Sequence, residues 1–573
     1  MCFVANLDIP APDKENFSPG GCPRLSWGGR LFFFRRLLGM RRGAGRGGGR
    51  AAAALLGAAA LPGLAAGAPW ALGLGAVARW LPGWHAPGGG GAAPDGAADA
   101  GALEVLRRAL RLRTVAGPEG GGSGEWGRLH ALLRGAYPAA FARARAELLL
   151  EHTLMLTWTG SDPSLPAHIL VSHSDVVPAP GAEAWTLPPF AGEVRDSYVW
   201  GRGALDTKTS LVQIMSALEQ LARRPGFKPR RTLVVCFGHD EETGGAGARA
   251  VARTLKERGL EVDTVFDEGG FVLLDGMEGL FGAAPGALVG IAEKRVLNIN
   301  VTAVHGGGHS SLPMRDGQSV PSTLAAIALE VERRPPPARL TLATEAFLMS
   351  AARTARWYLR PVLALAGLPG VRSVAACLMQ LSGHEGDAMV RSTVAVTKIG
   401  EAGEALNSMP RSGWMVLNFR AQPGDDDETL LEYTRKAVRR AGAEGRTTLE
   451  IVREGGGEAH EPPGVADPRG PAFAAVELAI RQTLGDRFPG LVVAPYLLSG
   501  ATDSRHFGGL AKGGAVRFTP MSLRKRDIGR IHSVDERISL QDFFDGIAFY
   551  RRLVELISDG MEELEYTKLG GEF

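Results

Sequence analysis

Cysteine is scarce in this chain, and its spacing matches no cysteine-rich metal motif. The 573 residues contain four cysteines, Cys2, Cys22, Cys236 and Cys377. No Cys-X-X-Cys pair occurs, so neither a cysteine-ligated zinc site nor a disulfide framework is expected. Low cysteine use still leaves a secretory location open.

The chain also lacks an excess of either charge. It has 64 Lys and Arg against 61 Asp and Glu, and the basic residues do not cluster across the folded region. No nucleic-acid partner is therefore expected. Apolar residues make up 45% and charged residues 22%, which is typical of a globular protein. The length is too great for one hydrophobic core and predicts two or three domains.

Residues 1–100 have the composition of a targeting segment followed by a linker. Residues 1–50 are rich in Gly and Arg, and an uncharged Ala/Leu/Gly run follows at 51–78. This run exceeds the roughly 20 apolar residues that span a bilayer. A basic flank before an apolar run is typical of a secretory signal or anchor, so we expect a secreted, luminal or single-pass membrane-anchored protein. An organelle transit peptide and a disordered low-complexity tail are the alternatives.

Strand and helix patterns alternate in the first part of the folded region. Apolar runs at 168–172, 232–237 and 262–266 read as buried strands, and the segments at 210–222 and 246–258 read as helices. This alternation predicts an α/β fold with a mainly parallel sheet and helices on both faces.

The pattern changes after Lys294. Residues 296–304 alternate apolar and polar side chains, which is typical of a half-exposed antiparallel strand. We expect a smaller α+β domain at 295–425, inserted between catalytic-domain segments at 101–294 and 426–573. The apolar stretch at 344–382 predicts additional helices within it.

Histidine and carboxylate residues follow the three predicted strands. They are His173 with Asp175, Glu241 with Glu242, and Asp267 with Glu268. Strand ends on one edge of an open α/β sheet converge in space, so these side chains are expected to meet. Histidine and carboxylates without cysteine favour zinc, or a similar divalent metal, in a hydrolytic site.

Each motif has a plainer interpretation when taken alone. A buried His-X-Asp pair is often structural, although its spacing lets Asp175 accept a hydrogen bond from His173 and fix the imidazole tautomer. Asp206, in a glycine-rich turn, precedes a helix and fits an N-cap. The acidic run at 240–242 fits a solvated loop. The combination of motifs favours a metal site.

Five motifs together resemble the M20 family of metallopeptidases and amidohydrolases. They are HSDVVP (173–178), GRGALDTK (201–208), GHDEETGG (238–245), DEGG (267–270) and IHSVDE (531–536). The resemblance covers about residues 102–558 and is greatest to the branch of N-fatty-acyl-amino acid synthase/hydrolases and the yeast Gly-X carboxypeptidase. It implies a zinc-peptidase catalytic domain, an inserted lid or dimerisation domain, and two zinc ions per subunit.

The resemblance also implies roles for individual residues. His173, Asp206 and Asp267 would bind one zinc, and Asp206, Glu242 and His532 the other, with Asp206 bridging them. Glu268 is the alternative to Asp267. Glu241 would act as general base, and Asp175 would orient His173.

In the inserted domain, three residues match lid positions of the family. His309 would stabilise the oxyanion, often reaching into the site of a partner subunit, which implies a homodimer through the lid. Asn407 and Arg420 would contact the substrate, since an arginine can grip a carboxylate with two hydrogen bonds. Asp503 and Arg505 are weaker candidates.

The implied activity is hydrolysis of the amide bond of N-acyl amino acids that bear a free carboxylate, by a metal-bridged hydroxide, with reversal at high reactant concentration. The alternative is a carboxypeptidase that releases C-terminal residues from peptides. A non-catalytic binding relative is the alternative of another class, and its signature would be loss of a ligand or of Glu241.

Overall fold

The computed structural model describes residues 96–117, 122, 124–275, 284–313, 316–401, 405–452 and 464–559. The apolar run at 51–78, expected to be a signal or anchor, lies outside these residues. Within the described ranges, no helix is both long and apolar enough to cross a bilayer. The first described helix, α2 (Gly96–Arg111), begins inside the segment expected to be linker.

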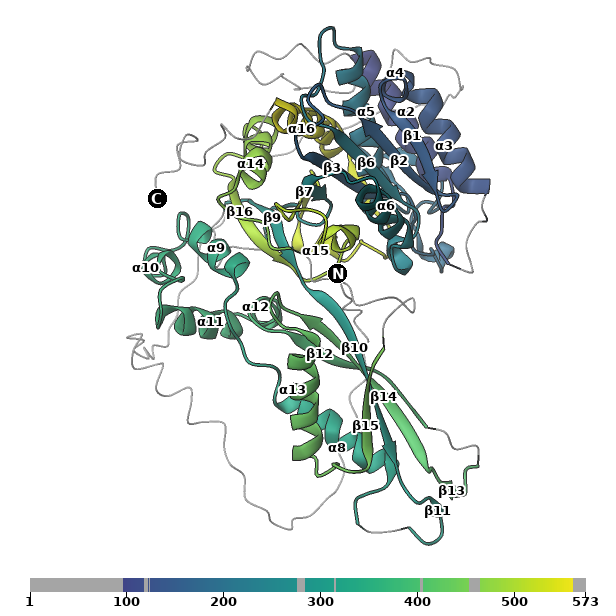
Figure 1. The fold of residues 1–573 in the computed structure, drawn as a ribbon, viewed down its shortest axis with the longest axis vertical. Coiled ribbons are helices and arrows are strands. Elements are labelled where there is room, and N and C mark those ends of the chain that lie inside the picture. Colours follow the sequence, from purple (N-terminus) through teal and green to yellow (C-terminus); the bar gives the residue numbers. More distant parts are fainter. Residues whose placement is uncertain are drawn as a thin grey trace, which may run out of the picture. The chain divides into compact units, whose positions relative to one another are not determined.

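A ten-stranded sheet forms the centre of the catalytic domain (Figure 1). Its path runs β1-β2-β6-β3-β7-β17-β9-β8-β18, and β16 also pairs with β9. The run β6-β3-β7-β17 is parallel, whereas β1, β2 and the β9 pairings with β17 and β8 are antiparallel. The strands are β1 (Arg145–Leu149), β2 (Thr153–Trp158), β3 (Ala167–His173), β6 (Leu233–Gly238), β7 (Val262–Asp267), β8 (Val272–Leu273), β9 (Gly286–Glu293), β16 (Val492–Leu498), β17 (Ala515–Arg517) and β18 (Ser522–Leu523). The expected α/β class with a mainly parallel central sheet is confirmed.

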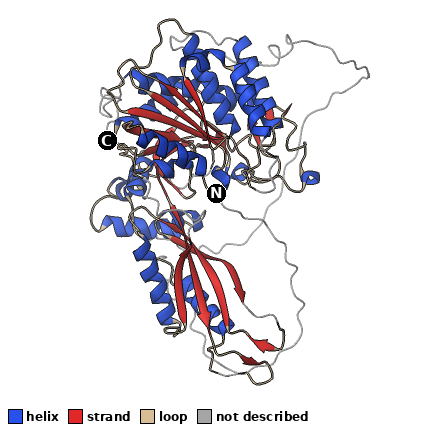
Figure 2. Cartoon of the chain, turned by 45° about the vertical axis from the view of Figure 1, so that its right-hand side comes forward, coloured by secondary structure: helices blue, strands red, loops and turns tan. Residues whose placement is uncertain are grey.

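Helices cover both faces of this sheet (Figure 2). Alternate residues of β6 explain why: Val235 and Phe237 join the core that contains α5, while Val234 and Cys236 join the core that contains α6. Both faces are therefore apolar, as the period of two along a strand requires of a strand buried on both sides. The helices of this domain are α2, α3 (Gly124–Ala136), α4 (Pro138–Arg143), α5 (Lys208–Arg223), α6 (Ala246–Glu257), α14 (Pro471–Leu484), α15 (Lys525–Ile528) and α16 (Leu540–Asp559).

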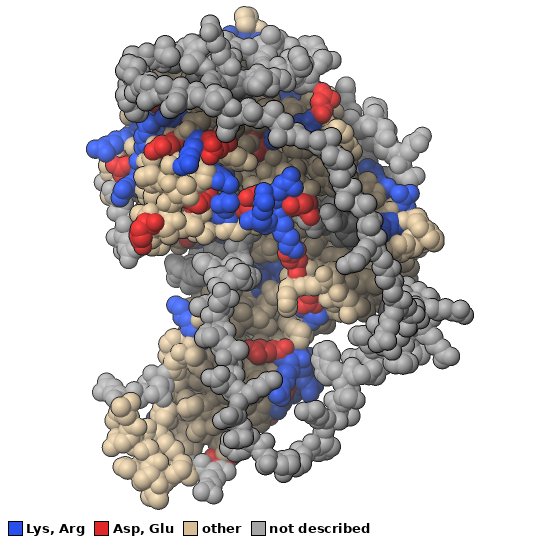
Figure 3. Space-filling view, turned by 180° about the vertical axis from the view of Figure 1, so that it is seen from behind, with Lys and Arg blue, Asp and Glu red and all other residues tan. Residues whose placement is uncertain are grey.

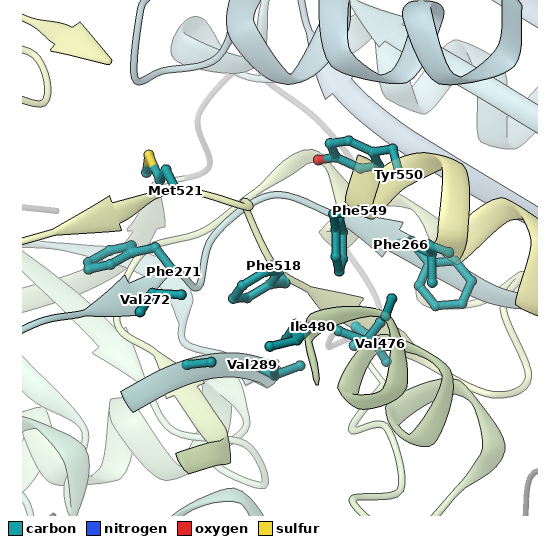
Figure 4. Close-up of a cluster of buried hydrophobic side chains, with 14 of the residues drawn as sticks. Phe266, Phe271, Val272, Val289, Val476, Ile480, Phe518, Met521, Phe549 and Tyr550 are labelled. Carbon is teal, nitrogen blue, oxygen red and sulfur yellow. The ribbon is translucent and has the colours of Figure 1, made fainter. Parts of the chain in front are cut away.

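Aromatic side chains fill the core beside α14 and α16. Figure 4 shows Phe518 and Phe549 side by side within it, and their ring centroids lie 5.3 Å apart. This packing joins the C-terminal helix α16 to the sheet. Residues near the end of the chain are thereby held against the same sheet that carries the first motifs.

A second sheet of four antiparallel strands, in the order β12-β14-β10-β15, has its own core with α8 and α13. Its elements are β10 (Arg295–Val304), α8 (Val320–Arg333), β12 (Thr393–Glu401), β14 (Ser412–Ala421), α13 (Asp427–Arg440) and β15 (Thr447–Val452). Because β15 pairs with β10, this domain continues beyond the boundary expected at residue 425. An exposed edge strand such as β15 carries a weak apolar signal, so the sequence alone gives little indication that residues after 425 join this sheet.

Four further helices follow α8 in the insertion: α9 (Leu342–Ala351), α10 (Arg360–Ala364), α11 (Val371–Leu381) and α12 (His384–Met389). They correspond to the helices expected at 344–382. Phe347 of α9 packs against Tyr496 of β16, with ring centroids 6.2 Å apart. This helical segment therefore belongs to the core of the large sheet.

Two small sheets complete the described fold. One pairs β4 (Glu193–Arg195), β5 (Tyr198–Trp200) and β19 (Arg537–Ser539), and the other pairs β11 (Gly308–His309) with β13 (Ser408–Met409). On the face seen in Figure 3, basic and acidic side chains lie interspersed.

The buried imidazole of His168 predicts a pH dependence of stability. Its side chain lies inside the sheet on β3, where burial lowers its pKa to about 3. Below about pH 6.5 His168 is protonated in the unfolded chain but stays neutral in the folded state. The free energy of unfolding therefore decreases as the pH falls toward 3. The loss is about 1.4 kcal/mol per pH unit from this group. Urea unfolding measures the free energy of unfolding at each pH. Between pH 6 and 4 this free energy should change less steeply with pH in His168→Leu than in the wild type, whereas the exposed control His384→Leu should keep the wild-type pH dependence. Equal slopes for wild type and His168→Leu would contradict this account.

Candidate metal centre

The strand β3 ends at His173, whose ring is buried and held from one side. Its Nδ1 lies 3.0 Å from the backbone oxygen of Asp175 and 3.3 Å from Oδ1 of the same residue. These acceptors favour the proton on Nδ1 and leave Nε2 to face the site. The expectation that Asp175 orients His173 thus has a geometric basis, through both its carbonyl and its carboxylate.

Asp175 also fixes the loop that follows β6. Its carboxylate accepts hydrogen bonds from the backbone N–H groups of Glu241 at 3.2 Å and Glu242 at 3.1 Å. The neighbouring Asp240 turns away and accepts from the backbone of Ala246 and Gly247 at the start of α6. Of the three consecutive acids, only Glu241 and Glu242 are therefore aimed into the site.

Asp206 is held by a loop that is built around a buried glutamate. Glu536 accepts hydrogen bonds from the backbone N–H groups of Leu205 at 2.7 Å, Asp206 at 3.1 Å and Gly203 at 3.1 Å. Its carboxylate also pairs with Arg202 at 2.6 Å. This one side chain thus joins the Asp206 loop to the distant motif at residues 531–536.

His532 enters the site from that same motif. Its backbone φ is 62°, a left-handed conformation that is uncommon for residues other than glycine. Its Nε2 lies 3.0 Å from Asp206 Oδ2 and 3.0 Å from Glu242 Oε1. A strained backbone that is held at a site is typical of a functional position.

The side chains form two groups that share Asp206. Its Oδ1 lies 2.9 Å from His173 Nε2, and its Oδ2 faces His532. Glu268 lies 3.2 Å from His173 Nε2, and Glu242 lies beside His532. Each oxygen of Asp206 therefore faces one histidine, and each histidine contacts one further glutamate.

The structure places Glu268, rather than Asp267, in this cluster. Asp267 uses Oδ2 to accept from the backbone of Ser504 at 2.7 Å and Oδ1 to accept from the backbone of Glu268 at 2.8 Å. Successive side chains at the end of a strand point in opposite directions, so only one of this pair can face His173. Of this pair, Glu268 faces His173 and Asp267 does not, and which of the two binds a metal stays a prediction.

The electrostatics of the cluster call for added positive charge. Burial raises the pKa of Glu268 to about 7 and also raises the pKa of Glu241 well above its usual range. Hydrogen bonds to Asp206 and Glu242 raise the pKa of His532 to about 10. Several carboxylates thus share one buried volume, and only protons or cations can offset their mutual repulsion.

Arg505, a weaker candidate in the sequence analysis, contacts the cluster. It lies in a short helical turn, η5 (Asp503–Phe507), and its Nη1 is 3.0 Å from Glu241 Oε1. The Asp503 carboxylate of the same turn packs so closely that a Cβ on Gly238 would lie 2.4 Å from Oδ2. Gly238 is therefore required by this packing, and the turn is pressed against the Glu241 loop.

Comparison with known proteins identifies the family. A model of peptidase family M20/M25/M40 matches residues 169–556.

The chain belongs to peptidase family M20.

Two relatives of this M20 chain differ in their described activities. The N-fatty-acyl-amino acid synthase/hydrolase PM20D1 of Homo sapiens is 32% identical over 421 residues, covering 73% of this chain and 80% of that protein. A probable carboxypeptidase S-like 2 of Dictyostelium discoideum is 30% identical over 443 residues, covering 75% of this chain and 79% of that protein.

Solved structures support the same fold. The M20 family metallo-carboxypeptidase Sso-CP2 from Sulfolobus solfataricus has a TM-score of 0.56 at 16% identity, covering 80% of this chain and 99% of that one. Human carnosine dipeptidase 1 has a TM-score of 0.51 at 13% identity, covering 81% and 97%. The expected family and an enzymatic role are thereby confirmed, and the family implies a divalent metal.

The three residues expected to bind substrate lie on the four-stranded sheet and at the small sheet of β11 and β13. His309 is on β11 and contacts the Ser311 hydroxyl through Nδ1 at 2.7 Å, while the backbone oxygen of Asn407 accepts from Ser310. Arg420 is on β14. Among the described residues, no recorded contact joins these three to the histidine–carboxylate cluster, so their roles in this M20 chain stay predictions.

Replacing Glu536 tests whether its hydrogen bonds to the Asp206 loop support metal binding in this M20 protein. In Glu536→Gln, an amide NH₂ would face backbone N–H groups that need an acceptor. Loss of such a supporting partner typically weakens metal binding about 10–100-fold. Chelator competition should show this weakening, while the exposed control Glu193→Gln should bind metal as the wild type does. Wild-type affinity in Glu536→Gln would show that the loop needs no such support.

Proposed function

We propose that this chain is a two-zinc hydrolase that cleaves the amide bond of N-acyl amino acids with a free carboxylate. One observation carries the proposal: each oxygen of Asp206 faces a histidine that is itself paired with a second glutamate. This is the donor set of two cation positions that share a bridging carboxylate.

The residues fit zinc in chemistry as well as in number. His173, Asp206 and Glu242 offer ligand atoms within 4.8 Å of one another, and so do His173, Glu241 and Glu268. Imidazole nitrogen and carboxylate oxygen, without thiolate, suit zinc in a catalytic site. We assign His173, Asp206 and Glu268 to one ion, and Asp206, Glu242 and His532 to the other.

Two zinc ions in such a site supply a water of lowered pKa and positive charge that stabilises a tetrahedral intermediate. Glu241 is placed to take the proton of the attacking water and deliver it to the leaving amine nitrogen. The Arg505 guanidinium holds one Glu241 oxygen, and Asp175 holds the Glu241 backbone. The base is thus fixed from two sides and keeps its direction through both proton transfers.

The substrate class rests on the similarity to relatives of described activity. The N-fatty-acyl-amino acid synthase/hydrolases of Homo sapiens and Bos taurus are each 32% identical to this chain, over 421 and 464 aligned residues. We propose that Arg420 receives the carboxylate of the amino acid and that His309 stabilises the oxyanion, with Asn407 beside them. The lid would join two copies into a homodimer, in which His309 of one copy serves the other.

A carboxypeptidase is the second candidate. The carboxypeptidase S-like relatives match over a similar length, and both substrate classes present an amide next to a free carboxylate. Only the group on the far side of the scissile bond differs, an acyl chain in one class and a peptide in the other.

The number of zinc ions bound per chain shows whether Glu268 or Asp267 is the metal ligand. Glu268→Ala should reduce bound zinc from two ions per chain to one, because one position loses a ligand. Asp267→Asn should keep two, since that side chain accepts only backbone N–H groups. Elemental analysis after dialysis measures both variants, with the exposed Glu385→Ala as control. The opposite pattern would return the ligand role to Asp267.

Turnover tests both the base and the substrate class. With zinc or cobalt present, the enzyme should release the amino acid from a fatty-acyl amino acid faster than it cleaves an N-blocked dipeptide.

Glu241→Gln should lower kcat by about 10²–10⁴-fold while two zinc ions stay bound, because it removes only the proton carrier. Preference for the dipeptide would favour the carboxypeptidase, cleavage of neither would refute the substrate class, and unchanged turnover in Glu241→Gln would refute the base.

A further inference from the structure

Helix α11 has apolar side chains on two opposite sides. Ala375, Ala376 and Met379 are buried in the core of the large sheet. Val374 and Leu381 face outward and are 53% and 70% exposed. Because i and i+7 lie on one side of a helix, these two form an outer apolar stripe on a surface where polar residues are normal.

The turns that flank α10 extend this apolar surface. Trp357, between α9 and α10, is 79% exposed, and Tyr358 beside it is half exposed. Leu365 and Leu368, just after α10, are also about half exposed. We call these six side chains the α10–α11 surface: Trp357, Tyr358, Leu365, Leu368, Val374 and Leu381. Figure 1 shows α10 and α11 at the outer left edge of the drawing, α11 below α9.

The segment that carries this surface has basic but no acidic residues, and Glu345 and Glu385, at its two ends, are paired with Arg372 and Lys525. Residues 346–384 contain four arginines, Arg353, Arg356, Arg360 and Arg372, and no Asp or Glu. Arg356 and Arg360 donate to uncharged acceptors, the Tyr358 hydroxyl and the Ala355 carbonyl. Their positive charge therefore flanks the exposed Trp357.

We propose that the α10–α11 surface docks this enzyme on the headgroup layer of an anionic lipid bilayer. Trp and Tyr have an apolar ring and a polar edge, so they settle at the boundary between acyl chains and water. The outer stripe of α11 enters the same boundary as an amphipathic interfacial helix does, and Arg356 and Arg360 bind anionic headgroups. A partner protein or a second copy of this chain would be less selective for negative charge, since protein surfaces carry both signs.

Docking there has a consequence for the catalytic sheet. Helix α9 joins the surface to β16 through Phe347 and Tyr496, and β16 runs directly toward the turn that carries Arg505. The bilayer would therefore lie against the same structural unit as the metal centre. The docking surface is independent of which substrate the enzyme cleaves.

Cys377 permits a local test, because it is exposed on α11 among the stripe residues. The full chain with Cys2→Ser and Cys22→Ser is labelled at Cys377 with an environment-sensitive fluorophore, since Cys236 is buried. Vesicles of phosphatidylcholine with phosphatidylserine should shift the emission to the blue, and vesicles of phosphatidylcholine alone should bind at least tenfold more weakly. Attachment through residues 51–78 alone would leave this probe unshifted.

Charge reversal identifies the contact. Arg356→Glu with Arg360→Glu should weaken anionic-vesicle binding by well over tenfold, since each basic residue contributes about fivefold. The control pair Arg108→Glu with Arg143→Glu, at exposed positions on α2 and α4, changes net charge equally and should bind as the unreversed protein does. No probe shift on anionic vesicles would overturn the proposal, as would equal weakening in both pairs. A shift that depends on protein concentration without vesicles would assign the surface to a second copy.

Discussion

The Asp206 carboxylate, placed between two histidines, is the contact on which the rest of the site depends. His173 comes from the end of β3, and His532 comes from a loop more than three hundred residues later. In the proposed role of a bridge between two cations, this carboxylate needs partners that hold its position. Glu536 provides that support through three backbone N–H groups and Arg202.

Other acids at this end of the sheet act mainly as supports. Asp175 binds the backbone of Glu241 and Glu242, Asp240 caps α6, and Asp267 binds the backbone of Ser504. These carboxylates accept hydrogen bonds from backbone N–H groups and so hold the backbone of the loops from which the other acids reach the histidines. The division of labour explains why so many acids occur in the motifs while so few face the histidines.

Much of this arrangement could be predicted from sequence. Apolar runs that end in His173, Glu242 and the Asp267–Glu268 pair predicted convergence at one sheet edge, and the structure places these strand ends together. The choice between Asp267 and Glu268 could not be made, because it depends on which side of the β7 end faces His173. The contribution of His532 needed the family motif, because distance along the chain carries no information about contact. Glu536 was visible in that motif but had no assigned role, since only the folded loop reveals its three backbone partners.

Two features of the fold carry only a weak signal in the sequence. Strand β15 is an edge strand whose alternating side chains are partly exposed, so its apolar signal is weak. The helices predicted at 344–382 are present, but their apolar composition does not show which side chains are buried, and Trp357 and Leu381 face outward.

The most direct test of the central claim is a crystal structure of the zinc-loaded enzyme with anomalous scattering recorded at the zinc edge. Two peaks about 3.5–4 Å apart are expected. They should flank the Asp206 carboxylate, with His173 and Glu268 at one and His532 and Glu242 at the other. A single peak, or a peak bound by Asp267 in place of Glu268, would contradict the account.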